Sequence, residues 1–145
     1  MRELPRKLTV DELAELFEGR TRFVDRLAAV EDPLERADEL IREVPEDELL
    51  EALDVHPAIG AKALSDRSAL EQGPDADAAV ETDLAYLNQV YEEKFGFRFV
   101  VFVNRRPKAE ILDVLRDRLA RTREEELETA VGELVAIARD RWQHP

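Results

Sequence analysis

The chain has 145 residues, 44% hydrophobic and 38% charged, so it is long enough to fold as one domain (residues 1–145) around a hydrophobic core. Its formal net charge of −13 argues against nucleic-acid and anionic-membrane partners, because binding phosphate groups requires a basic face. Because the chain has no cysteine, no apolar run long enough to span a membrane and no secretory pattern at its start, we expect a cytoplasmic protein without disulfide bonds or sulfur-ligated zinc.

Capping residues and prolines separate the helical patterns of the first half of the chain. Thr9 with Glu12 forms a capping-box pattern that predicts the first helix start. Asp32 followed by Pro33 predicts an N-cap and first-turn pair, and Ser65 can cap a short helix. The expected helices cover residues 11–19, 21–30, 33–44, 45–55 and 66–72.

The second half contains three longer helical patterns and one extended segment. A helix is expected over 75–95, with an apolar stripe formed by Val80, Leu84, Leu87 and Tyr91. Helices are also expected over 108–120 and, after a capping box of Thr122 with Glu125, over 123–142. The segment 97–103, "FRFVVFV", resembles a strand, but a lone strand cannot form a sheet. We therefore predict an all-α, single-domain bundle of about eight helices, with 97–103 as a buried extended connector or weak pairing element.

His56, the only histidine away from the C-terminus, stands before Pro57 at the end of a predicted helix. A residue before proline is pushed toward an extended conformation, which would place the imidazole on a rigid corner. The C-terminal end of the helix dipole favours a cationic histidine, so the position suits an acid/base group with a pKa near neutrality. The alternative is a surface-loop histidine without a role.

Three polar residues of the short helix, Ser68, Glu71 and Gln72, share one helical face. Together they offer a hydroxyl, a carboxylate and an amide that could bind the polar edge of a heterocycle or a ureido group. A solvated helix face explains the same pattern, because the whole segment is polar.

Arg141 continues the apolar stripe of the last predicted helix. A guanidinium on such a face must reach solvent or meet an anion, because an unpaired buried charge is costly. A substrate carboxylate or Glu71 could be that anion. The alternative is an arginine that covers a frayed helix end.

Other chemistries lack a pattern in this sequence. With one internal histidine and no cysteine we expect no metal site, and no Ca²⁺-loop spacing, dinucleotide or phosphate-binding glycine motif, or nucleophile elbow occurs. A Ser–His–Asp triad could be assembled from Ser68 and His56, but we discount it because the sequence has no nucleophile elbow.

Taken together, four ordered motifs resemble a known family. "HPAIG" (56–60), "SALEQ" (68–72), "LNQVYEEKFGFRFVV" (87–101) and "RLARTREEELETAVGELVAIARDRW" (118–142) look like 2-oxo-4-hydroxy-4-carboxy-5-ureidoimidazoline (OHCU) decarboxylase. The resemblance covers roughly residues 10 to 143 and implies an all-α, usually dimeric fold. It also implies conversion of OHCU to (S)-allantoin and CO₂, a step of urate breakdown that needs no cofactor.

The resemblance also implies roles for individual residues. His56 would be the catalytic acid/base, Glu71 would orient the substrate, and Arg141 would hold carboxylate or carbonyl oxygens. The remaining expected substrate-binding residues are Pro57, Ser68, Gln72, Phe99, Val101 and Val103, the last three through backbone amides and apolar side chains against the imidazoline ring. Two alternatives stay open: a non-catalytic helical interaction module on the same scaffold, or a decarboxylase of a related ureido or heterocyclic acid.

Overall fold

The computed structural model describes residues 3–59 and 78–145 and is all-helical there, as predicted. The described part holds seven helices and no strand. They are α1 (Val10–Leu16), α2 (Arg22–Ala28), α3 (Ala37–Ile41), α4 (Glu46–Asp54), α6 (Ala78–Phe95), α7 (Lys108–Leu119) and α8 (Arg123–Gln143). The short helix expected over 66–72 lies outside the described residues.

Two helices begin at the capping boxes that the sequence predicts. The Thr9 hydroxyl accepts a hydrogen bond from the Glu12 N–H (3.1 Å), and the Glu12 carboxylate accepts one from the Thr9 N–H (3.0 Å). Thr122 and Glu125 make the same reciprocal pair at the start of α8, at 3.2 and 3.0 Å. Each box satisfies two N–H groups that a helix start otherwise leaves without partners.

The predicted start of the third helix is wrong. Asp32 has a φ of +52°, whereas an N-cap residue is extended, and its N–H donates to the Arg6 carbonyl at 2.7 Å. This distant contact turns the chain at Asp32, and α3 begins only at Ala37 after a turn over 33–36.

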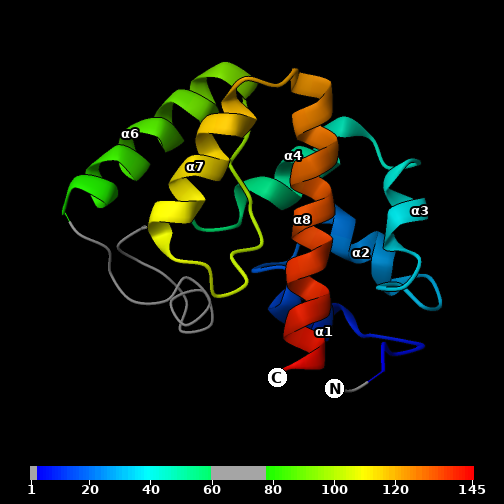
Figure 1. Cartoon of the computed structure of the whole chain (residues 1–145). Coiled ribbons are helices and arrows are strands. Elements are labelled where there is room, and N and C mark those ends of the chain that lie inside the picture. Colours follow the sequence, from blue (N-terminus) through cyan, green and yellow to red (C-terminus); the bar gives the residue numbers. More distant parts are fainter. Residues whose placement is uncertain (1–2, 60–77) are drawn as a thin grey trace.

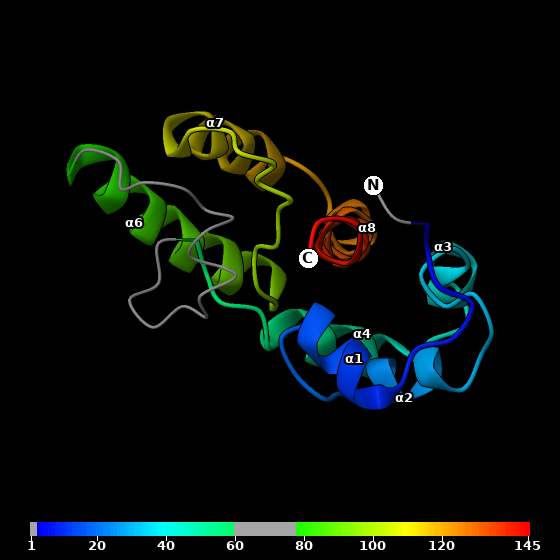
Figure 2. The same cartoon turned by 90° about the horizontal axis from the view of Figure 1, so that it is seen from below.

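Helix α8 lies at the centre of the molecule. In Figure 1 the α6–α7 pair stands to the left of it and α3 to the right, and the view along α8 in Figure 2 shows α1, α2 and α4 grouped on one side, apart from the α6–α7 pair. α8 packs against α1, α3 and α4, while α6 packs against α7. None of the described helices is long and apolar enough to cross a membrane.

The segment 97–103 passes between the α6–α7 pair and α8 (Figures 1 and 2). Its side chains are largely buried: Phe97, Phe99, Val100, Val101 and Val103 are 1–5% exposed. The prediction of a buried extended connector is confirmed. Arginine side chains bind its carbonyls in place of a neighbouring strand, which satisfies polar backbone groups that burial would otherwise leave unpaired.

Candidate functional site

The His56 corner follows directly from the end of α4. The backbone N–H of His56 donates to the Leu53 carbonyl at 3.2 Å, and Pro57 then prevents further helix. The His56 residue is only 5% exposed, so the surface-loop interpretation is wrong. Its Nε2 atom is buried and makes no hydrogen bond within the described structure. Such an atom costs stability and therefore calls for an explanation, of which a ligand is one.

His56 carries no charge at neutral pH. Its pKa is lowered from 6.5 to about 4, mainly by burial and also by the nearby positive charge of Arg141, while the carboxylate of Glu18 partly opposes both effects. The expectation of a pKa near neutrality was wrong, because desolvation outweighs any help from the α4 dipole. The imidazole is thus poised to accept a proton before it can donate one.

Arg141 lies on the buried face of α8 and is 4% exposed. Its guanidinium donates to the Leu16 carbonyl (3.0 Å) and pairs with the Glu18 carboxylate (2.8 Å). The alternative of an arginine covering a frayed helix end is therefore wrong. The buried cation meets an anion, as expected, although the anion identified here is Glu18.

Glu18 was not found from the sequence. It follows the end of α1, with a left-handed φ of +66° that a glutamate rarely adopts, and its side chain is 13% exposed. No periodicity in its neighbourhood predicts an inward-facing carboxylate. A strained backbone that turns a charged group inward is a feature often found at functional sites.

Arg98 is a second residue that the sequence did not single out. Its Nη1 donates to the carbonyls of His56 and, at 3.4 Å, of Asp54, while its backbone N–H donates to the Asp54 carboxylate at 3.2 Å. Its Nε pairs with Glu92 of α6 at 3.2 Å. Arg98 therefore fastens the start of segment 97–103 to the His56 corner.

The carbonyl groups and the N–H groups of segment 97–103 differ in their hydrogen bonding. The carbonyl of Val100 accepts from Arg118, and those of Phe102 and Val103 accept from Arg106. By contrast, no hydrogen bond within the described structure has a backbone N–H of residues 99–103 as its donor. These amides therefore have no protein acceptor within the described part of the chain.

The other predicted site residues are placed only in part. Phe99, Val101 and Val103 are buried in the connector, and Pro57 is half-buried beside His56. Ser68, Glu71 and Gln72 lie outside the described residues. Of the three residues predicted to be catalytic, His56 and Arg141 lie near enough to interact electrostatically. Within 3–59 and 78–145, no group of three His, Asp or Glu side chains could hold a metal ion.

Two solved structures are similar to this fold. A crystal structure of OHCU decarboxylase in the presence of (S)-allantoin matches with a TM-score of 0.76 and 26% identity, covering 90% of this chain and 94% of that one. An (S)-allantoin synthase matches with a TM-score of 0.67 at 22% identity, covering 92% and 48%, a likeness of fold alone.

Sequence relatives agree with this likeness. The chain is 30% identical over 158 residues to the 2-oxo-4-hydroxy-4-carboxy-5-ureidoimidazoline decarboxylase of Halalkalicoccus jeotgali, covering 91% of this chain and 88% of that protein. It is 27% identical over 152 residues to the uric acid degradation bifunctional protein PucL of Bacillus subtilis, covering 97% of this chain but only 31% of that protein. The similar bifunctional protein of a Bacillus strain is 32% identical and is covered to 22%, so this chain spans less than a third of either bifunctional relative. The family model for OHCU decarboxylase matches residues 2–143, and the chain belongs to the OHCU decarboxylase family.

Proposed function

We propose that this protein decarboxylates OHCU to (S)-allantoin and CO₂, without a cofactor, in the breakdown of urate. The observation that carries the proposal is the buried, unpartnered Nε2 of His56 in the electrostatic field of the buried Arg141 guanidinium. Family membership supports it, as does the name of the Halalkalicoccus jeotgali relative, an OHCU decarboxylase.

The reaction needs a proton relay that His56 is suited to perform. When the bond to the carboxylate breaks, CO₂ leaves as a neutral molecule and the electron pair stays on the ring. A proton must then reach a ring carbon, so the overall change consumes one proton from solvent. A neutral His56 first accepts the proton of the substrate's 4-hydroxyl group at Nε2 and then delivers it to the ring carbon from one face, while the proton from solvent neutralises the ring nitrogen that takes up the electron pair. Delivery from a single fixed position would set the S configuration.

Charge and burial would favour the loss of CO₂. Arg141 attracts the substrate carboxylate, and its pairing with Glu18 keeps the guanidinium in place. A site shielded from water removes the hydration that stabilises a carboxylate, while neutral CO₂ loses little by this. The donors around the site then stabilise the negative charge that develops on the ring.

The connector would form the binding surface for the ring. In this proposal the free backbone amides within 99–103 donate to substrate oxygens, and Phe99, Val101 and Val103 pack against the imidazoline. Glu71 orients the hydroxyl or ureido group, and Pro57, Ser68 and Gln72 complete the pocket. These assignments rest on the resemblance of the motifs, and each can be tested by substitution.

The test uses OHCU generated freshly from urate with uricase and hydroxyisourate hydrolase. The circular dichroism of allantoin is followed with wild-type protein, with His56→Ala, and with His144→Ala as the matched control. We expect rapid appearance of the (S) signal with the wild type and His144→Ala, and its loss in His56→Ala. Spontaneous, racemic product with wild-type protein would refute the proposal. It would favour a related ureido acid as substrate or a non-catalytic interaction module.

We also propose a homodimer acting in the cytoplasm, on the basis of the resemblance of the sequence. Light scattering coupled to size exclusion would measure the mass in solution against the 16.6 kDa of one chain. Fractionation of the source cells would test the location.

A further inference from the structure

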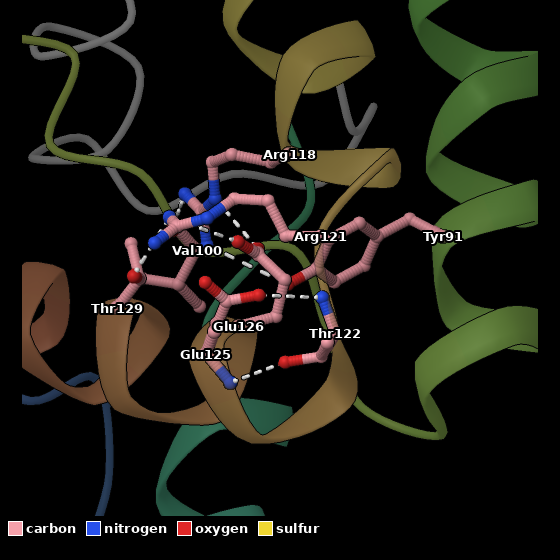
Figure 3. Close-up of polar contacts among 8 residues, drawn as sticks. All are labelled: Tyr91, Val100, Arg118, Arg121, Thr122, Glu125, Glu126 and Thr129. Carbon is pink, nitrogen blue, oxygen red and sulfur yellow. Dashed lines mark hydrogen bonds and ion pairs between the residues drawn. The ribbon is translucent and has the colours of Figure 1, made fainter.

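A buried polar cluster joins three helices behind the connector (Figure 3). Glu126 of α8 is fully buried; its Oε1 accepts from the Tyr91 hydroxyl (2.6 Å) and from Arg118 Nε (2.7 Å). Its Oε2 accepts from Arg121 at 3.3 Å. Burial and the hydrogen bond to Glu126 raise the pKa of Tyr91 above its usual range, so the phenol stays a donor.

Arg118 is the member of this cluster that reaches the connector. Its Nη1 donates to the Val100 carbonyl at 2.7 Å, and its guanidinium carbon lies 4.6 Å from the centroid of the Phe99 ring. One planar group therefore binds Glu126, a connector carbonyl and a connector aromatic ring at once. A peptide unit is planar, so fixing the Val100 carbonyl also fixes the direction of the Val101 N–H that shares its plane.

Burying the charged groups of this cluster costs desolvation free energy that apolar packing of the core would avoid. Removing two charges from water costs several kcal/mol per ion, and apolar residues of similar size often serve stability as well or better. Arg118 and Glu126 have side chains only 6% and 0% exposed, so they bear this cost in full. The hydrogen bond from Arg118 fixes the geometry of the connector, which apolar packing would not do in the same way.

We propose that Arg118 is a positioning residue that aims the Val101 backbone amide and the Phe99 ring at the substrate. The inference rests on the proposed function. Arg118 acts through the peptide between Val100 and Val101 and does not itself touch the substrate. This role extends the site to α7, a helix that contributes neither His56 nor Arg141.

The substitution Arg118→Lys separates positioning from charge pairing. Lysine keeps the positive charge for Glu126, but its single ammonium lacks the fork that spans Glu126 and the Val100 carbonyl together. Arg116→Lys is the matched control, because Arg116 lies on the same helix, with a half-exposed side chain paired to Asp83 and Asp113. Should Arg118→Lys fail to fold, the double variant Arg118→Gln/Glu126→Gln removes both buried charges together.

The readouts are KM, kcat and the enantiomeric excess of allantoin, measured on protein whose helical circular dichroism matches the wild type. We expect Arg118→Lys to lower kcat/KM by about tenfold or more, with a raised KM and a reduced excess of the S form. Arg116→Lys should stay within about twofold of the wild type. A loss of stability alone would reduce the active fraction and leave KM unchanged. The enantiomeric excess is compared at enzyme concentrations that give equal total rates, so that the spontaneous, racemic decay of OHCU contributes equally in each protein.

The outcomes separate this inference from the proposed function. Wild-type protein that leaves OHCU to its spontaneous decay overturns the proposed function, and with it the substrate role of Arg118. An active wild type whose KM and enantiomeric excess survive both Arg118→Lys and the double variant overturns the role of Arg118 alone. Amide hydrogen exchange gives a check that does not depend on activity, since Arg118→Lys should speed exchange within 99–103 and not across α8. Unchanged exchange in the connector would also overturn the inference.

Discussion

Burial of a neutral His56 makes the stability of the protein depend on pH in a calculable way. Its pKa is about 4 in the folded chain against 6.5 as the ordinary value. Between these values the unfolded chain binds a proton that the folded chain does not, so protonation favours unfolding. The contribution of neutral His56 to the free energy of unfolding is complete above pH 6.5 and is lost as the pH falls toward 4.

The expected size follows from the two pKa values. Proton linkage at this one site lowers the free energy of unfolding by about 2 kcal/mol at pH 5 and has little effect at pH 7. Wild-type protein should therefore lose about 2 kcal/mol between pH 7 and pH 5 through His56 alone. Other groups also titrate in this range, so only a comparison with a variant lacking the imidazole isolates the effect.

His56→Leu is the variant to compare, and His144→Gln is its control. Urea unfolding followed by circular dichroism at pH 5, 6 and 7 gives the free energy of unfolding for each protein. The loss on going from pH 7 to pH 5 should be about 2 kcal/mol smaller in His56→Leu than in the wild type. His144→Gln retains His56 and should lose as much as the wild type. Equal losses in wild type and His56→Leu would refute a buried, neutral His56.

Three further outcomes are expected. Glu18→Gln removes the carboxylate that pairs with the buried Arg141 guanidinium at 2.8 Å and should lower the free energy of unfolding by about 3 kcal/mol in urea, whereas the exposed control Glu15→Gln should change little. Thr122→Ala removes the cap of α8 and should cost about 1 kcal/mol by the same assay, with Thr122→Ser restoring most of it. The pH profile of kcat/KM should stay flat from pH 8 to 5, because it reports the free enzyme's His56; a half-loss near pH 6.5 would contradict the lowered pKa.

Features set by neighbouring residues could be predicted from the sequence. The capping boxes at Thr9 and Thr122 depend on residues three positions apart, and both appear as expected. The connector was expected because an apolar run after Gly96 had no partner strand. The prediction of Asp32 as an N-cap was wrong for the opposite reason, because a hydrogen bond to the Arg6 carbonyl, far away in sequence, sets its conformation.

The site was harder to predict because its chemistry depends on distant contacts. The need of Arg141 for an anion followed from its place on an apolar face, but its partner Glu18 lies at the far end of the chain. The lowered pKa of His56 follows mainly from burial, which no local pattern reports. Arg98 and Arg118 bind backbone carbonyls, and a carbonyl has no signature in the sequence.

The charges at the site suggest why a neutral histidine and a paired arginine occur together. The carboxylate of Glu18 offsets part of the positive charge of Arg141, while the charge of Arg141 still lowers the pKa of His56. In the proposed reaction, a bound carboxylate would add one negative charge near His56 and raise the affinity of the imidazole for a proton. Once CO₂ had left, the charge would have moved from the carboxylate to the ring, and the proton held by His56 would follow it. The same burial that makes His56 a weak base in the free protein would then make the protonated imidazole a strong acid.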